Sequence, residues 1–167
     1  MNLQLIVQII STTAVILGIL FGVLNLLNFQ KMRKREAAIL MLNSFQTNDF
    51  VRGLLLVFDM KDGVTKSEID QLPKEDFLAL YILLGTWERL GILVHSREIP
   101  LSLVDDAYSG PILISWQKLS NFVQEFRQLV QRDTGFEWFQ WLAEQMQKQE
   151  QTSSAIPAYI NFKGWKP

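Results

Sequence analysis

The first part of the chain is a mostly apolar run from Leu3 to Phe29 that carries no ionisable side chain. As an α-helix rising about 1.5 Å per residue, this run is long enough to cross a hydrocarbon core about 30 Å thick. No positive charge precedes the run and no small-residue cleavage site follows it, which favours a retained anchor over a cleaved signal peptide. The sequence therefore predicts a transmembrane helix over residues 1–30.

Polar and small residues recur within this run at alternating spacings of three and four. The row consists of Gln4, Gln8, Ser11, Val15, Gly18, Gly22 and Asn25. A repeat of about 3.5 residues arranges them as one polar stripe along the helix. Amides that face lipid have no hydrogen-bond partners, so the stripe predicts that several copies associate. It serves either as a helix-packing seam or as a pore lining with Val15 as an apolar constriction, and the pattern by itself favours the seam.

A basic cluster follows the apolar run, and its members are Lys31, Arg33, Lys34 and Arg35. By the positive-inside rule, the cluster predicts an N-terminus outside and a C-terminal domain in the cytoplasm. We expect these side chains to contact anionic lipid headgroups, and nucleic-acid binding is the less favoured interpretation. Strong helix formers from Glu36 to Leu42 predict a helical juxtamembrane extension over residues 31–46.

Caps, breakers and helical periodicity divide residues 47–151 into a bundle of about five helices. Helices are expected over residues 50–60, 74–95, 102–108, 111–132 and 136–149, with a short turn from Ser67. The 74–95 segment is nearly hydrophobic all round, but the charged pair Glu88–Arg89 interrupts it, which predicts a core helix and not a second span. Pro111 is expected to start a new helix after Ser109–Gly110. Because no strand pattern is present, the predicted fold is all-α.

The C-terminal tail, residues 152–167, carries the aromatic side chains Tyr159, Phe162 and Trp165. Solvated tails seldom contain three aromatic residues. We therefore expect this tail to dock onto a surface or a neighbouring subunit.

Composition excludes several kinds of chemistry. The chain has no cysteine and one histidine, so it lacks the residues for a disulfide framework, a thiolate metal site or a typical multi-histidine zinc site. No glycine-rich phosphate loop is present, and no metal or cofactor is expected. The basic cluster takes four of the 16 basic side chains and leaves 12 against 17 acidic ones, a net charge of −5 over residues 36–167. This charge argues against a general nucleic-acid surface on the domain.

One pair of residues matches a catalytic pattern loosely. Arg89 and His95 have the Arg-x4-6-His spacing of HEPN ribonucleases, in which the arginine steadies phosphate charge and the histidine acts as acid and base. The structural alternative is favoured: Arg89 pairs with Glu88 or another carboxylate, and His95 ends its helix, where the dipole favours it. No enzymatic activity is expected from these two residues.

A wider resemblance rests on the apolar start, the basic stop and the segment Trp87–Leu93. Its further positions are Val104, Tyr108, Trp116 and the pair Phe126–Arg127. In these features the chain resembles an uncharacterised family of small bacterial proteins with one N-terminal transmembrane helix and a helical cytosolic domain. It is also similar to the HEPN-like membrane accessory protein of type VI CRISPR systems.

The resemblance to that accessory protein implies a ring-like homo-oligomer in the bacterial inner membrane, with a HEPN-like domain and a CRISPR or other defence partner. It also implies that the polar stripe lines a channel, that Arg89 and His95 are the motif positions, and that depolarisation of the membrane supports antiphage defence. It thereby favours a pore over a seam. The alternatives are a membrane-tethered HEPN-type ribonuclease and a non-conducting scaffold that localises a partner.

Overall fold

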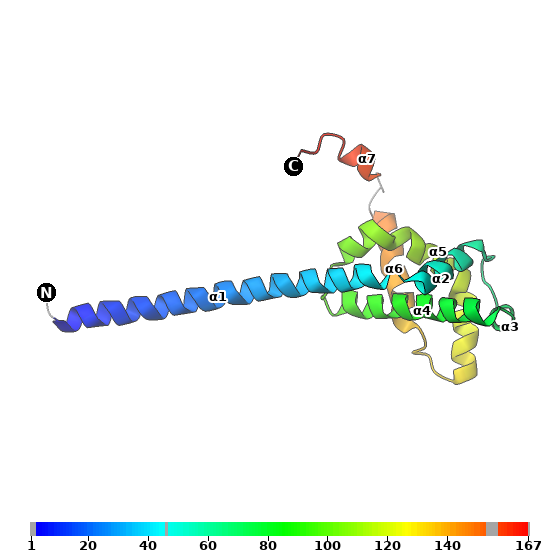
Figure 1. The fold of residues 1–167 in the computed structure, drawn as a ribbon, viewed down its shortest axis with the longest axis horizontal. Coiled ribbons are helices and arrows are strands. Elements are labelled where there is room, and N and C mark those ends of the chain that lie inside the picture. The colour runs from blue at the N-terminus through cyan, green and yellow to red at the C-terminus, as the bar shows by residue number, and fades with distance from the viewer. Residues whose placement is uncertain (1–2, 46, 153–156, 167) are drawn as a thin grey trace. The chain divides into compact units, whose positions relative to one another are not determined.

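The structure, a computed structural model, describes residues 3–45, 47–152 and 157–166. These residues form seven α-helices and no strand, which confirms the all-α prediction (Figure 1). The chain divides into two compact units, Met1–Leu40 and Met41–Pro167. An apolar N-terminal helix is thus followed by a helical domain, and each is described separately below.

The described residues of the first unit all belong to helix α1, Leu3–Ser44. Its segment Ser11–Phe29 has 19 residues and a mean hydropathy of 1.9, so it is long and apolar enough to cross a membrane. The helix does not stop at the basic cluster but runs unbroken to Ser44, as the helix formers after Glu36 predict.

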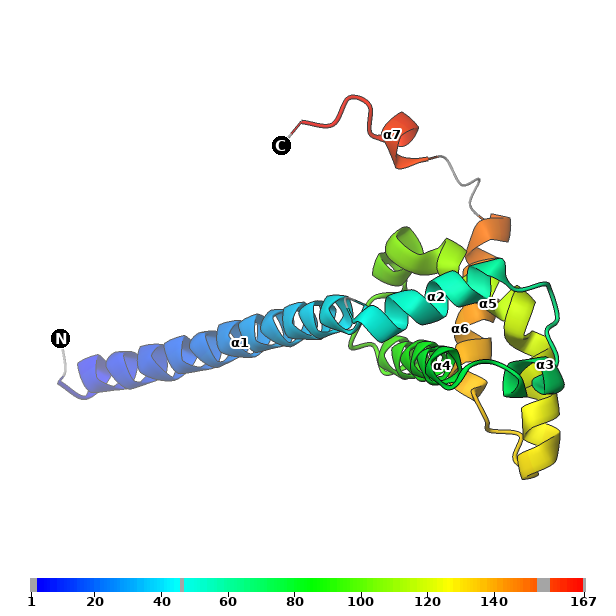
Figure 2. The same cartoon turned by 45° about the vertical axis from the view of Figure 1, so that its right-hand side comes forward.

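The second unit is built around α4, Lys74–His95, whose bounds agree with the sequence prediction. This helix packs against α2, Asn48–Asp59, and against α6, Glu137–Thr152 (Figure 2). By length and composition α4 also qualifies as a membrane span, but half of it is buried inside the domain. Burial against its neighbours explains its apolar character, and α4 is the core helix that the sequence predicts.

Large aromatic side chains fill the centre of this unit. Trp87, Phe122 and Phe139 are fully buried, and the indole Nε1 of Trp87 donates to Ser115 Oγ at 3.3 Å. That bond satisfies a donor that would otherwise be buried without a partner. The three residues come from α4, α5 (Leu101–Val130) and α6, so these three helices share one core.

Residue 45, directly after the end of α1, is part of this aromatic core. Phe45 is buried, with its ring centroid 4.0 Å from that of Tyr108, 4.8 Å from Phe50 and 5.5 Å from Trp87. Aromatic pairs at such distances add to the stabilisation from burial alone. The segment that leaves α1 is therefore anchored inside the helical domain.

Two glycines allow the helices of this unit to approach closely. A Cβ on Gly53 would overlap the carbonyl oxygen of Ala79, where α2 meets α4. A Cβ on Gly91 would overlap the carbonyl oxygen of Trp138, where α4 meets α6. Both neighbours are backbone atoms and cannot rotate away, so these two contacts require glycine.

Helix α5, Leu101–Val130, corrects one prediction. The expected break between residues 108 and 111 is absent, and Pro111 lies inside one helix of 30 residues. Proline removes one helical hydrogen bond and commonly bends a helix, and the ribbon of α5 changes direction along its length (Figures 1 and 2). Val104 on one side of Pro111 and Ile112 and Ser115 on the other are buried in the same core, which offsets the lost bond.

Short helices and caps complete the unit. Thr47 caps α2 by accepting the Phe50 N–H at 3.2 Å, as the predicted capping cluster requires. The turn expected from Ser67 is helix α3, Lys66–Asp70, which begins earlier because Thr65 and Glu68 form a capping box. Lys61, together with Thr65, lowers the pKa of Glu68 to about 2. In the tail, α7 spans Ala158–Asn161.

Candidate functional site

The polar stripe on α1 is exposed along its whole length. Every member is solvent-accessible: Gln4, Gln8, Ser11, Val15, Gly18, Gly22 and Asn25. The hydroxyls of Ser11 and Thr12 donate to the Gln8 carbonyl oxygen at 3.1 and 2.8 Å, which is the usual way such groups are satisfied inside an apolar helix. The stripe therefore presents its amides and glycines outward from the helix.

The helix geometry holds the stripe on one side. An α-helix turns about 100° per residue, so a repeat of 3.5 residues drifts by about 20° per heptad. Over the length of the row the drift keeps all seven members within an arc of about 100°. The row therefore winds slowly around α1, and a partner helix that followed it would wrap around α1 with a left-handed twist.

Gly18 and Gly22 are the two glycines of this surface. A Cβ built on either residue meets nothing within 4 Å. Within the described chain no neighbour requires these glycines, in contrast to Gly53 and Gly91. Small residues four apart let a second helix come close in a membrane, so a close contact at these glycines would be made with a helix outside this chain.

The predicted lipid-contact residues Lys31, Arg33, Lys34 and Arg35 all lie in α1. Arg33 and the neighbouring Met32 are exposed. The side chains of Lys31, Lys34 and Arg35 lie outside the described residues. The headgroup contact stays a prediction.

In the helical domain, an open groove of about 870 Å³ runs between α2 and α4. Its apolar part is formed by Leu78, Tyr81 and Ile82 of α4. The charged side chains along it are Asp49, Arg52, Glu75, Glu88 and Arg89. Carboxylates and guanidinium groups are interleaved here, so the groove is not a uniformly basic or acidic surface.

Arg52 makes two ion pairs beside the groove, and no feature of the sequence singles it out. Its Nη1 donates to Glu75 Oε2 and its Nε to Asp76 Oδ1, each at 2.7 Å. The carboxylate of Glu75, followed by that of Asp76, raises the pKa of Arg52. These ion pairs are exposed to solvent, where such pairs contribute little stability. The pair Glu75–Asp76 in the first turn of α4 is the only local hint of a basic partner.

The structure places Arg89 and His95 against different neighbours. Arg89 lines the groove with α2 and donates to Thr86 Oγ1 at 3.5 Å. His95 lies in the last turn of α4 as expected, with its ring 4.6 Å from that of Trp138 and 5.6 Å from that of Trp141 on α6. Within one chain these side chains do not converge on a common point, so one domain alone does not assemble an arginine–histidine site.

Glu88, expected as a partner of Arg89, has another role. Its Oε2 accepts the Phe139 N–H at 2.8 Å, at the start of α6. That helix begins after Phe136, whose φ of 54° is unusual for an aromatic residue and whose side chain cannot cap. Glu88 thus supplies from α4 the acceptor that the first turn of α6 lacks.

Arg127 of α5 holds the other side of this junction. Its Nε donates to the Gly135 carbonyl oxygen at 2.7 Å, its Nη1 to Gln140 Oε1 at 2.7 Å and its Nη2 to the Phe136 carbonyl oxygen at 3.3 Å. Bonds to a charged donor are stronger than neutral ones. Arg127 and Glu88 therefore fix the start of α6 between α4 and α5.

Two substitutions of Glu88 should distinguish its role as a hydrogen-bond acceptor for α6 from the effect of its negative charge. Glu88→Ala leaves the first N–H groups of α6 without their acceptor and should cost about 1–2 kcal/mol of unfolding free energy. Glu88→Gln keeps an acceptor oxygen and should stay close to wild type. Thermal unfolding of the full chain in detergent measures both variants, and equal losses for the two would contradict the capping role.

The difference in unfolding free energy between wild type and Glu88→Gln should depend on pH. Burial raises the pKa of Glu88 above its ordinary 4.5, against the lowering effect of the peptide N–H groups. When folding raises the pKa of a carboxyl group, the folded state binds its proton more tightly than the unfolded state does. The free energy of unfolding of the protein therefore decreases as the pH rises through the folded-state pKa. The free energy of unfolding of wild type should therefore decrease, relative to that of Glu88→Gln, as the pH rises from acidic to neutral.

Metal-binding chemistry finds no support in the part of the chain that the structure describes. No group of three or more histidine, aspartate or glutamate side chains lies close enough there to hold an ion.

Comparison with known protein families gives a match over most of the chain. Residues 9–146, from within the stripe of α1 to α6, match the family described as "Domain of unknown function (DUF4760)". No curated protein and no solved structure matches the chain, so the resemblance to the type VI CRISPR accessory protein stays a prediction. Because the match covers most of its length and includes both the apolar helix and the helical domain, the chain belongs to the DUF4760 family.

Proposed function

We propose that this protein is a homo-oligomeric protein of the bacterial inner membrane whose copies associate through the polar stripe of α1 and form a pore. The observation that carries the proposal is the single row of polar and small residues, exposed like the rest of α1, on a helix that is mostly apolar and long enough to span a bilayer. A pore of this kind would permeabilise and depolarise the membrane.

Self-association follows from the energetics of the amides. Side-chain amides placed in hydrocarbon without a partner cost several kcal/mol each, and interhelical bonds between them return about 0.6–2 kcal/mol. Gln4, Gln8 and Asn25 are the amides of the stripe, and all three are exposed. A second copy of the same helix offers both the donors and the acceptors that they need.

A water-filled lumen satisfies the same groups without requiring each amide to face another. The stripe places amides toward its two ends and Val15 between them. A ring of valines in a narrow lumen is an apolar constriction that closes by dewetting. This order, together with the resemblance to a pore-like accessory protein, favours the pore over a closed seam.

Orientation in the membrane is part of the proposal. The basic cluster at residues 31–35 supports an N-terminus outside and a helical domain in the cytoplasm. Fusions of a reporter that is active on only one side of the membrane to either terminus test this orientation. Activity of the C-terminal fusion on the outer side would contradict it.

Dye release from liposomes tests the pore. Vesicles reconstituted with wild-type protein should release a small trapped dye under activating conditions, and Val15→Ser should release it faster, by about tenfold or more, because a polar ring no longer excludes water. Leu20→Ser, on the opposite side of the helix, is the matched control and should not produce this gain.

Three results would separate the proposal from its alternatives. Absence of release from wild type and from Val15→Ser, with the oligomer intact, would indicate a non-conducting scaffold. Cleavage of RNA that is lost in His95→Ala would indicate the HEPN-type ribonuclease, whereas a pore should keep its release rate in that variant. In cells, the defence role requires that expression of this protein reduces the number of phage plaques only when it also depolarises the membrane.

A further inference from the structure

The C-terminal segment Pro157–Lys166 exposes apolar side chains that the rest of the helical domain does not cover. The exposed fractions are 78% for Tyr159, 52% for Ile160, 60% for Phe162 and 70% for Trp165. No residue of α7, which forms the first part of this segment, is buried. So much exposed aromatic surface in ten residues indicates a contact outside the described domain.

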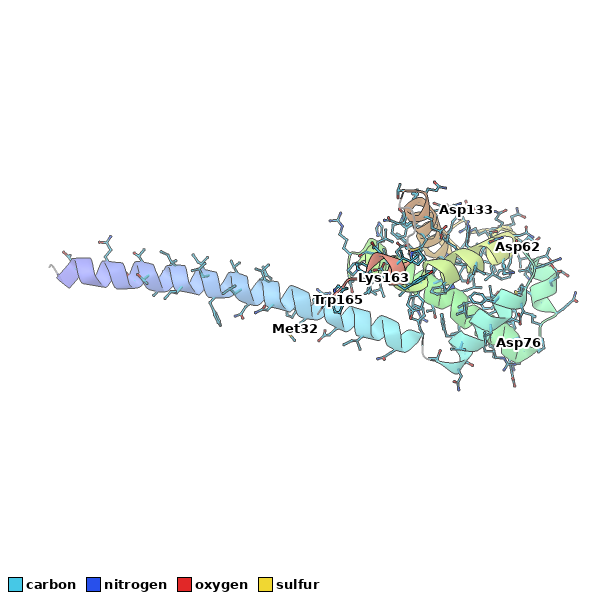
Figure 3. The ribbon with its side chains drawn as sticks, turned by 90° about the horizontal axis from the view of Figure 1, so that it is seen from above. Met32, Asp62, Asp76, Asp133, Lys163 and Trp165 are labelled. Atoms are coloured by element: carbon cyan, nitrogen blue, oxygen red, sulfur yellow. The ribbon has the colours of Figure 1, made fainter. Side chains whose placement is uncertain are left out.

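The charge of the segment has a single sign. Lys163 and Lys166 are its only charged side chains, and no acidic residue follows Glu150. Lys163 and Trp165, labelled in Figure 3, both belong to the short stretch after α7. Basic and aromatic side chains therefore occur together on one segment.

We propose that this segment is a second membrane contact, which lies in the interface of an anionic bilayer. Tyrosine and tryptophan suit this location because their rings are apolar while the phenol O–H and indole N–H bind water or headgroups. Lysine side chains bury their methylene stems and keep their ammonium groups at the level of the phosphates. Ile160 and Phe162 supply the apolar area that enters the acyl boundary.

A segment of this length would bind a bilayer weakly if it were free. It is part of a chain whose α1 can cross the membrane, so its local concentration at that membrane is high and weak partitioning suffices. The inference rests on the proposed function only for the insertion of α1, and not on the conduction of a pore. Its role would be to hold the helical domain at the membrane surface by both ends.

A single label tests this location in the full chain. The chain has no cysteine, so Asn161→Cys introduces one thiol in α7 for an environment-sensitive fluorophore. In phosphatidylcholine vesicles that contain phosphatidylglycerol, the label should be quenched by nitroxide-bearing lipid and protected from aqueous iodide. Vesicles of phosphatidylcholine alone should show weaker lipid quenching.

Charge and aromatic variants in the labelled background make the test specific. Lys163→Gln and Lys166→Gln should each weaken partitioning about fivefold, and Trp165→Ser should reduce lipid quenching as well. The matched control, Lys74→Gln with Lys148→Gln, removes two exposed lysines elsewhere on the domain and should leave the quenching unchanged.

Each other outcome overturns the proposal. Quenching by iodide alone would show a solvated segment, and protection from both quenchers would show docking onto protein, such as the groove between α2 and α4 of a second copy. The pore proposal fails separately. Loss of dye release with lipid quenching retained would contradict only the pore, and dye release with an iodide-quenched label would contradict only this contact.

Discussion

A Gly18→Leu, Gly22→Leu double variant should lose the oligomer and, with it, all dye release. Both positions lie on the exposed stripe of α1, and neither contacts another part of the described chain. Leucine side chains there would hold neighbouring helix backbones apart and remove the close packing on which association in a bilayer depends. The folding of the helical domain should not change, because Gly18 and Gly22 belong to the first unit.

Native mass spectrometry in nanodiscs measures this effect as a change in copy number. Thr13→Leu is the matched control, because it adds bulk about 180° from Gly22 on the same helix. It should keep the wild-type copy number and release rate. A double variant that remains assembled, or a wild type that is already monomeric, would contradict association through the stripe.

The copy number also decides between a pore and a seam. With neighbouring helices about 9 Å apart and a helix radius of about 5 Å, five copies leave a lumen radius of about 2–3 Å. Eight copies leave about 7 Å. A dimer or trimer leaves no lumen. A copy number of two or three for the wild-type protein would therefore exclude a channel lined by one helix per chain.

Gly91→Ala should strongly destabilise the helical domain, although alanine is the best helix former. The added Cβ would overlap the Trp138 carbonyl oxygen, so α4 and α6 would have to separate where Glu88 also caps α6. Overpacking of this kind costs about 1–3 kcal/mol and more where the obstacle is backbone. Gly53→Ala, which meets the Ala79 carbonyl oxygen, should behave in the same way at the α2–α4 contact.

The same helix provides the control for this prediction. A Cβ on Gly85 meets nothing within 4 Å, so Gly85→Ala should stabilise the domain by up to about 1 kcal/mol through helix propensity alone. Thermal unfolding followed by near-ultraviolet circular dichroism compares the three variants. If Gly91→Ala and Gly85→Ala shifted the midpoint of thermal unfolding in the same direction, this would contradict close backbone packing at Gly91.

The elements that the sequence predicts well are those whose cause is local. The length and lack of charge from Leu3 to Phe29 define an apolar helix without any tertiary partner. Thr47 caps α2 through a contact three residues away, and α4 has its predicted bounds because Pro73 precedes its first residue and its apolar run ends at His95. Each signal acts within a few residues along the chain.

The helix break expected at Pro111 is wrong for a reason that the local pattern cannot contain. Proline costs a hydrogen bond wherever it occurs inside a helix. Whether the helix ends there depends on burial of the residues on both sides, and the core that buries Val104 and Ile112 is formed by segments distant in sequence. The tertiary structure therefore decides between two helices and one.

By itself, the sequence determined an apolar helix with one polar stripe, an all-α domain with α4 as its core, and the absence of cysteine chemistry. Only the tertiary structure decided that Glu88 caps α6 across 51 residues, that Arg52 pairs with Glu75 and Asp76, and that Arg89 and His95 face different neighbours. The physical reason is that periodicity and capping depend on neighbours along the chain. Hydrogen bonds, ion pairs and backbone contacts between helices depend on how the helices pack, which no short stretch of sequence specifies.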